Sequence, residues 1–178
     1  MATNLEFIKA LDFNSSPTSA TLVVDECFSS KYQNYYVNIT KVDGNLSGYP
    51  LWLRFLDSSG SAINQSEYDF ASIQMNDNSS PSDLKTANTT LINYVGFSGS
   101  GSLDDDTYDT GSSIYIYNPF DSTCFTYVTA QASGVNNSNG LKGFKTIGCH
   151  KVTESVRGFR IGGHSAFYGC NINVYGIL

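Results

Sequence analysis

The sequence is poor in charge, because Asp, Glu, Lys and Arg together make up only 15% of its 178 residues. The usual share is about a quarter. Ten basic residues stand against 16 acidic ones, which gives a net charge of −6 and a pI near 4.6. Neutralising the phosphates of a nucleic acid takes clustered Lys and Arg. The composition therefore argues against a nucleic-acid-binding protein.

Long apolar runs and a signal segment are also missing. No run approaches the roughly 20 residues that a membrane span needs, and no apolar segment follows Met1. We expect a protein that stays soluble in the cytoplasm where it is made. The four cysteines lack the CxxC spacing of a zinc site. Most are expected to be small buried side chains, with one or two disulfides as the alternative. They are Cys27, Cys124, Cys149 and Cys170.

Histidine is scarce, and the sequence offers no recognisable catalytic set. His150 and His164 are the only two histidines, and no GxSxG nucleophile motif is present. Cys149 and His150 are adjacent, so on a strand they would face opposite ways. The acidic residues outside one loop are scattered, Glu67 and Glu154 among them. We therefore expect no enzyme, no catalytic residue and no cofactor.

One loop concentrates negative charge. Asp104, Asp105, Asp106 and Asp109 lie within six residues of one another. Calcium binds such oxygen ligands, but the alternating spacing and the closing Glu of an EF-hand are absent. A solvated loop is the favoured interpretation, with ion binding as the alternative, and no metal ligand is assigned.

Strand and turn residues dominate what is present, and aromatic residues reach 13%. The apolar run 51–56 reads as a central strand buried on both faces. The run 35–41 alternates between apolar and polar residues, which is typical of a strand with one dry and one wet face. These two segments are expected to be neighbours in one antiparallel sheet.

Further segments have the same character and are separated by turn signals. The first two segments, 5–13 and 20–24, are expected to form a hairpin, and a helix over 4–11 is the alternative for the first of them. Residues 64–76 fit a short helix or an irregular strand, and 76–88 and 98–111 read as surface loops. The further strand-like segments cover 5–13, 20–24, 89–97, 113–117, 124–129, 141–149, 151–153, 158–161 and 166–177. The sequence thus predicts one domain, 1–178, an all-β antiparallel sandwich, jelly-roll-like, of about nine or ten strands and at most one short helix.

Outward-facing tyrosines are the main candidate for a functional surface. Strand alternation places them opposite the apolar residues Val37, Ile114 and Ile116. Their amphipathic rings suit a subunit interface or a sugar-stacking platform. The competing interpretation is that they cover a second sheet inside the same sandwich. The candidate contact residues are Tyr36, Tyr115 and Tyr117.

Several stretches together resemble a known group of proteins. They are 5–9 (LEFIK), 27–35 (CFSSKYQNY), 53–61 (LRFLDSSGS), 68–69 (YD), 116–119 (IYNP) and 172–176 (INVYG). In these stretches the chain is similar, nearly end to end, to small virion structural proteins of tailed bacteriophages, especially marine and cyanobacterial ones. The shared motifs are structural, and no catalytic residue is carried over from them.

The resemblance implies a non-enzymatic virion protein, made in the host cytoplasm and located in the virion. Its most direct form is a capsid-associated decoration or head-fibre subunit that docks on other virion proteins. The alternative is a receptor-binding tail-fibre or carbohydrate-binding module that takes a host surface glycan. A homo-oligomer is expected, with a trimer as one form, because exposed sheet edges need cover.

Overall fold

The computed structural model describes residues 4–14, 21–44, 49–77, 79–98, 110–135, 140–163 and 166–178. Within these ranges the chain forms twelve β-strands and no helix. The strands make one eight-stranded and one four-stranded antiparallel sheet. This confirms the predicted all-β sandwich, with more strands than the nine or ten expected.

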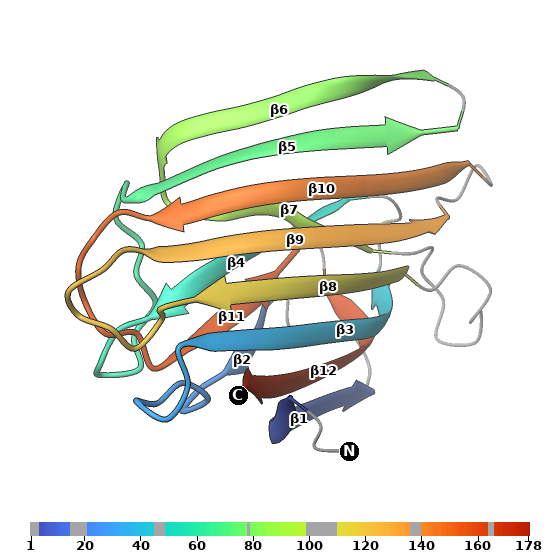
Figure 1. Cartoon of the computed structure of the whole chain (residues 1–178). Coiled ribbons are helices and arrows are strands. Elements are labelled where there is room, and N and C mark those ends of the chain that lie inside the picture. The colour runs from blue at the N-terminus through green and yellow to red at the C-terminus, as the bar shows by residue number, and fades with distance from the viewer. Residues whose placement is uncertain are drawn as a thin grey trace.

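The larger sheet faces the reader in Figure 1, from β6 at the top to β1 at the bottom, and the smaller sheet lies behind it. The larger sheet runs, in spatial order, β1 (Leu5–Asn14), β12 (Phe167–Ile177), β3 (Asn34–Gly44), β8 (Thr110–Tyr117), β9 (Thr126–Val135), β10 (Leu141–His150), β5 (Tyr68–Asn76) and β6 (Ser79–Thr89). The smaller sheet runs β2 (Thr21–Val24), β11 (Gly158–Gly162), β4 (Pro50–Leu56) and β7 (Ile92–Phe97).

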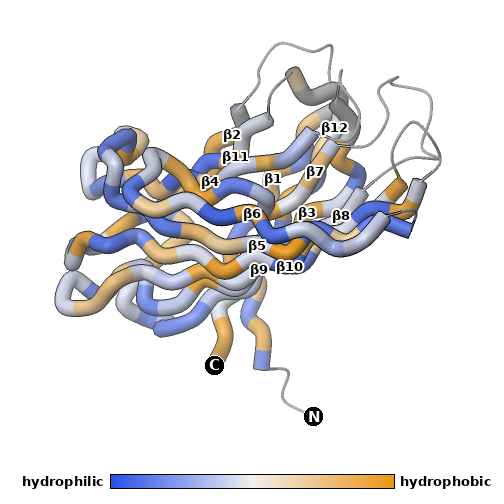
Figure 2. The backbone as a smooth tube through the Cα atoms, turned by 90° about the horizontal axis from the view of Figure 1, so that it is seen from above, coloured by the Kyte–Doolittle hydropathy of each residue, from blue (hydrophilic) through white to orange (hydrophobic). Residues whose placement is uncertain are grey.

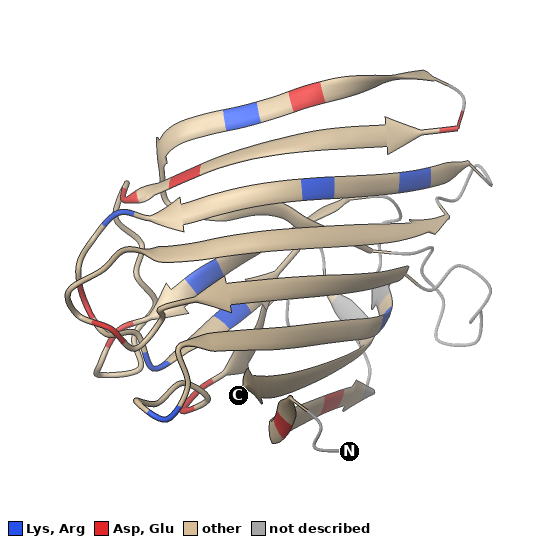
Figure 3. Cartoon of the chain, in the orientation of Figure 1, with Lys and Arg blue, Asp and Glu red and all other residues tan. Residues whose placement is uncertain are grey.

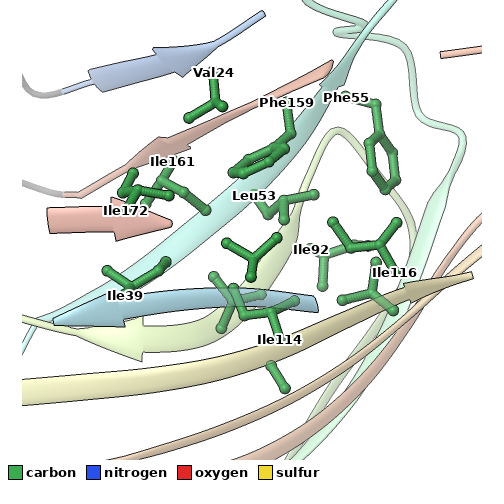
Figure 4. Packing of buried hydrophobic residues seen from close by; sticks show 14 of the residues in the cluster. Val24, Ile39, Leu53, Phe55, Ile92, Ile114, Ile116, Phe159, Ile161 and Ile172 are labelled. Atoms are coloured by element: carbon green, nitrogen blue, oxygen red, sulfur yellow. The ribbon is translucent and has the colours of Figure 1, made fainter. Parts of the chain in front are cut away.

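The core lies between the two sheets and is built by every second residue of the central strands. Apolar and polar residues alternate along many of the strands (Figure 2). Figure 4 shows branched and aromatic side chains from both sheets packed into one cluster. Among them Ile39, Ile114, Leu53, Phe159 and Ile172 have no exposed surface. Burying each such side chain contributes about 1.5–3 kcal/mol.

The predicted partnership of segments 35–41 and 51–56 is wrong, because β3 and β4 belong to different sheets. Burial of β4 on both faces is also wrong along most of the strand. Leu53 is fully buried, whereas Trp52 and Arg54 on the other side are partly exposed. The indole of Trp52 lies 4.7 Å from the guanidinium carbon of Arg54 and 5.5 Å from that of Arg160. Alternation fixes which side chains share a face, but it does not fix which strand lies alongside.

The predicted hairpin of the first two strands is wrong for the same reason. The first segment is a strand, β1, and not a helix, but it pairs with β12, whereas β2 pairs with β11 in the other sheet. Of residues 64–76, left open between helix and strand, all from Tyr68 onward form β5. Residues 151–153, expected as a strand, lie outside any strand.

The loop predicted at 76–88 is mostly strand β6, which forms one edge of the larger sheet. Nearly all its residues are exposed. Exposure on both faces removes the alternation that marks a half-buried strand, and β6 is ordered by its backbone pairing with β5. Of the loop predicted at 98–111, residues 99–109 lie outside the described part, and Thr110 and Gly111 open β8.

Candidate functional site

A row of four aromatic rings crosses the outer face of the eight-stranded sheet. Strand register places Phe7, Tyr175, Tyr36 and Tyr115 directly opposite one another on four adjacent strands, β1, β12, β3 and β8. We call these four residues the aromatic row. Its members point away from the core, since Phe7 is 57% and Tyr115 is 41% exposed.

The rings of the aromatic row contact one another in sequence. The ring centroids of Phe7 and Tyr175 lie 5.8 Å apart in an edge-to-face arrangement. Tyr175 and Tyr36 stack at 6.0 Å, and Tyr36 and Tyr115 lie 5.2 Å apart. Two residues further along β8, the ring of Tyr117 stacks on that of Tyr115, with ring centroids 6.5 Å apart and an interplanar angle of 17°. These spacings are those of favourable aromatic pairs.

The same register line continues into a groove on the other half of the sheet. Tyr115 lies opposite Thr129, Thr129 opposite Ile147, and Ile147 opposite Ala71. These last three residues line a groove of about 720 Å³, and so does Tyr127, which lies opposite Tyr117. The groove is mainly apolar, since Ile147 is 60% and Tyr127 is 48% exposed.

The groove carries charge only towards the β5–β6 edge. Asp69 and Lys85 line it there. A hydrogen bond from Lys151 holds the pKa of the Asp69 carboxyl below its usual value, so Asp69 is ionised at neutral pH. The thiol of Cys149 also lines the groove, and partial burial raises its pKa. A raised pKa makes this thiol a poor nucleophile.

Charge is absent from the middle of this face. The sequences of β8, β9 and β12 contain no Asp, Glu, Lys or Arg. Figure 3 shows these strands as uninterrupted tan ribbons, whereas charged residues lie on β1, β5, β6 and β10, on the smaller sheet and in the turns. Strand β3, between β12 and β8, carries charge only near its end, at Lys41 and Asp43. Low charge with exposed aromatic rings is the composition of an interface centre.

The three tyrosines expected to face outward do so. Tyr36 and Tyr115 belong to the aromatic row, and Tyr117 lies beside it. Their hydroxyls are near polar groups of the same face, with Tyr36 Oη 3.1 Å from Ser113 Oγ and Tyr117 Oη 3.4 Å from Thr129 Oγ1. They do not face the smaller sheet, so the competing interpretation of an inner position is wrong. Their role as contact residues stays a prediction.

Sequence reasoning missed Phe7, Tyr175 and Tyr127 as members of this surface. Alternation along β12 places Tyr175 outward, opposite in direction to the buried Val174. The sequence pattern put Phe7 on the same face as Leu11 and Phe13, but the register shift between Phe7 and Lys9 leaves Phe7 exposed while Leu11 and Phe13 pack against the core. What joins them to Tyr36 and Tyr115 is the pairing of distant strands, and no local pattern encodes that pairing.

The structure also brings together three residues that the sequence left apart. His150 is fully buried, and its Nε2 lies 3.4 Å from Glu67 Oε2 and 3.6 Å from Glu154 Oε1. As predicted, the adjacent Cys149 faces the opposite side of the sheet and lines the groove. The partners of the histidine are therefore carboxylates, and the neighbouring thiol is not among them.

The other residues singled out in the sequence have separate places. Cys27 and Cys170 are buried, as expected for small apolar side chains, whereas Cys124 is exposed and Cys149 is partly exposed. All four carry free thiols. His164 and the loop from Asp104 to Asp109 lie outside the described residues. Among the described residues there is no helix long and apolar enough to cross a membrane.

No family model and no curated protein matches the chain. Among solved structures it is similar to a disulfide-linked pilus of Bacillus endospore appendages, at 11% identity and a TM-score of 0.32, over 100% of this chain and 96% of that one. An alginate lyase from Alteromonas sp. 272 matches at 10% identity and a TM-score of 0.30, over 95% and 86%. A fructofuranosidase from Schwanniomyces occidentalis matches at 10% identity and a TM-score of 0.22, over 99% of this chain and 35% of that one. At these TM-scores none of the likenesses bears on what this chain does.

Proposed function

We propose that this chain is a non-enzymatic structural protein of a bacteriophage virion, a capsid-associated decoration or head-fibre subunit on the particle surface. Its docking face is the outer face of the eight-stranded sheet, and its partner is a neighbouring virion protein. The observation that carries this proposal is the aromatic row, set in register across four strands on a face whose centre has no charge.

Aromatic rings suit this task because they supply large apolar area with few rotatable bonds. A ring buries 150–250 Å² when it is fully covered, by the usual range. The rings of the aromatic row already contact one another, so little side-chain freedom is left to lose on docking. Such rigid, clustered aromatic residues are typical of the few positions that dominate binding energy.

The edges of the larger sheet are poorly suited to strand-to-strand association, which favours docking through the face. On the β6 edge, Pro81 lacks a backbone N–H, and Asp83 and Lys85 add charge. On the β1 edge, the register shifts between Phe7 and Lys9. Proline, charge and bulges are the features that keep natural sheet edges from pairing.

The proposal is tested first on purified phage particles of the type that encodes this chain. Mass spectrometry and immunogold labelling should find the protein in the particle, in many copies on the head. Absence of the protein from purified particles overturns the proposal. A few copies at the tail would replace the head assignment by the tail-fibre alternative.

A matched pair of variants tests the docking face. Tyr115→Lys places a charge at the β8 end of the aromatic row, beside Tyr36, whereas Val23→Lys places one on a comparably exposed apolar residue of the smaller sheet. Binding to particles stripped of the native protein should fall about tenfold or more with Tyr115→Lys and stay unchanged with Val23→Lys. Equal binding by both variants rejects the outer face of the larger sheet as the docking surface.

Glycan recognition by a tail fibre is the second candidate, and one observation favours it. Tyr115 and Tyr117 lie nearly parallel, at 17°, beside the 720 Å³ groove. Such a pair offers a stacking surface for sugar rings. A glycan panel should then show binding that Tyr115→Ala and Tyr117→Ala each remove. If no sugar binds the native chain, or if neither substitution changes the binding, this candidate fails.

A further inference from the structure

Three potential metal ligands meet where β10 ends, at the left end of that strand in Figure 1. His150 is the last residue of β10, Glu67 directly precedes β5, and Glu154 lies in the turn after β10. One ligand atom from each lies within 4.8 Å of the other two. We call these three residues the histidine cluster. It lies outside the docking face, since the His150 side chain points into the core.

The backbone holds all three residues in place. His150 pairs with Tyr68 across the β10–β5 ladder, and the N–H of Lys151 donates to the carbonyl of Glu67 at 2.8 Å. The turn that carries Glu154 is fixed by two bonds to a neighbouring loop. Ser155 Oγ donates to the carbonyl of Phe120 at 2.8 Å, and the N–H of Val156 donates to that of Pro119 at 2.8 Å. The backbone that carries the three ligands is therefore held in place without an ion.

The imidazole is oriented by packing as well. Its ring centroid lies 4.8 Å from that of Tyr68 and 6.0 Å from that of Phe55. Its Nδ1 atom is buried and makes no hydrogen bond within the described structure. Nε2 is thus the ring nitrogen that faces polar groups, and both carboxylates lie on its side.

The local charge favours a cation. Glu67 and Glu154 each lie within 4 Å of His150 Nε2, and neither forms an ion pair with a Lys or Arg of the described residues. When the imidazole is neutral, the two carboxylates, whose oxygens lie within 4.8 Å of each other, repel each other. They are 33% and 36% exposed, which leaves an entry path and room for a water ligand. A divalent ion would neutralise the pair.

The distances indicate the kind of ion. Tetrahedral zinc binds His nitrogen and carboxylate oxygen at about 2.0–2.2 Å, so two of its ligands lie roughly 3.3–3.6 Å apart. The two N···O distances of the cluster are 3.4 and 3.6 Å. Calcium and magnesium take oxygen ligands, and imidazole suits zinc and its first-row neighbours. We propose that Glu67, His150 and Glu154 bind a divalent transition-metal ion, Zn²⁺ in first place, with water as the fourth ligand.

Such an ion would join the end of β10, the start of β5 and the turn after β10. Because it binds the folded chain, it would raise the free energy of unfolding with the logarithm of the ion concentration once that concentration exceeds Kd. This role is independent of the docking face, and the proposal stands or fails separately from the virion function.

The test uses the full chain with Cys124→Ser as background, because an exposed thiol takes up metal by itself. After treatment with EDTA and desalting, calorimetric titration with Zn²⁺ should show one ion per chain. Titration with Co²⁺ should give the strong visible absorption of a tetrahedral site. Zn²⁺ should also raise the melting temperature. No saturable uptake of either ion overturns the proposal.

Substitutions then assign the ligands. Glu154→Gln and Glu67→Gln should each weaken Zn²⁺ binding about tenfold or more and remove the thermal stabilisation. Asp83→Asn, a change of the same kind at an exposed carboxylate on β6, should leave both unchanged. His150→Gln removes a buried ring and is informative only if circular dichroism shows a folded chain. Equal Zn²⁺ affinity in the native chain and both Glu variants overturns the assignment.

Discussion

Tyr68 replaces a missing strand neighbour, and removing its hydroxyl tests that role. The ladder between β4 and β7 covers only Pro50 to Leu53. Beyond it, the N–H of Phe55 donates to Tyr68 Oη at 3.1 Å, and the carbonyl of Phe55 accepts from the N–H of Ile63 at 3.0 Å. Tyr68 Oη in turn donates to the carbonyl of Ile63 at 3.3 Å. One hydroxyl thus completes the hydrogen bonding of β4 from the opposite sheet.

Tyr68→Phe keeps the ring and deletes this hydroxyl. Tyr68 and Phe55 have no exposed surface and Ile63 is 5% exposed, so water has little access to the groups left behind. A buried donor or acceptor without a partner costs about 1–3 kcal/mol. The substitution leaves the N–H of Phe55 and the carbonyl of Ile63 without this partner. We therefore expect the free energy of unfolding to fall by about 2–4 kcal/mol. For a chain of this size each kcal/mol lowers the melting temperature by about 2–4 °C.

Equilibrium denaturation in urea measures the loss, and Tyr115→Phe is the matched control. It makes the same chemical change at a half-exposed ring, where we expect less than about 0.5 kcal/mol. If Tyr68→Phe costs no more than Tyr115→Phe, the hydroxyl of Tyr68 does not substitute for a strand and the reasoning is refuted.

Three further outcomes are expected. Burial raises the pKa of the Cys27 thiol to about 12, so a thiol reagent at pH 8 should modify exposed Cys124 first and Cys27 only on unfolding; rapid native labelling of Cys27 would contradict this. Hydrogen bonds from Ser and Gly groups of its turn, the Ser59 hydroxyl first, lower the pKa of Asp57. The ionised carboxylate therefore stabilises the fold fully above the unfolded pKa of about 4. This stabilisation is lost as the pH falls through the lower pKa of the folded state. Asp57→Asn should therefore make the melting temperature less dependent on pH on the acid side. A Cβ at Gly162 would overlap the indole of Trp52, so Gly162→Ala should cost about 1–3 kcal/mol and shift the emission of the chain's single tryptophan, whereas an unchanged spectrum and stability would show that the indole moves freely.

The alternation of single strands could be read from the sequence. In β3 as far as Thr40, and throughout β8, residues of one parity are buried and those of the other are at least partly exposed, as the sequence pattern predicts. A register shift between Ile39 and Val42 then reverses the parity at the end of β3. Such alternation is local, because successive side chains of a strand point to opposite faces. Turn signals separated most strands correctly for a similar reason, since turn residues act within a few positions.

Long-range pairing could not be read. The hairpin predicted for β1 and β2 and the partnership predicted for β3 and β4 both assumed that neighbours in sequence are neighbours in a sheet. Strand β6 was missed because a strand exposed on both faces has no apolar rhythm and takes its order from backbone bonds to β5.

The sequence by itself determined an all-β sandwich and the outward direction of Tyr36 and Tyr115, because period-two patterning depends only on residues next to each other in the chain. Only the tertiary structure decided that Phe7 and Tyr175 extend these two rings into one row, and that Glu67 and Glu154 meet His150. Both arrangements depend on which distant strands pair and in what register. That choice is made by the packing of the whole core, and no single segment encodes it.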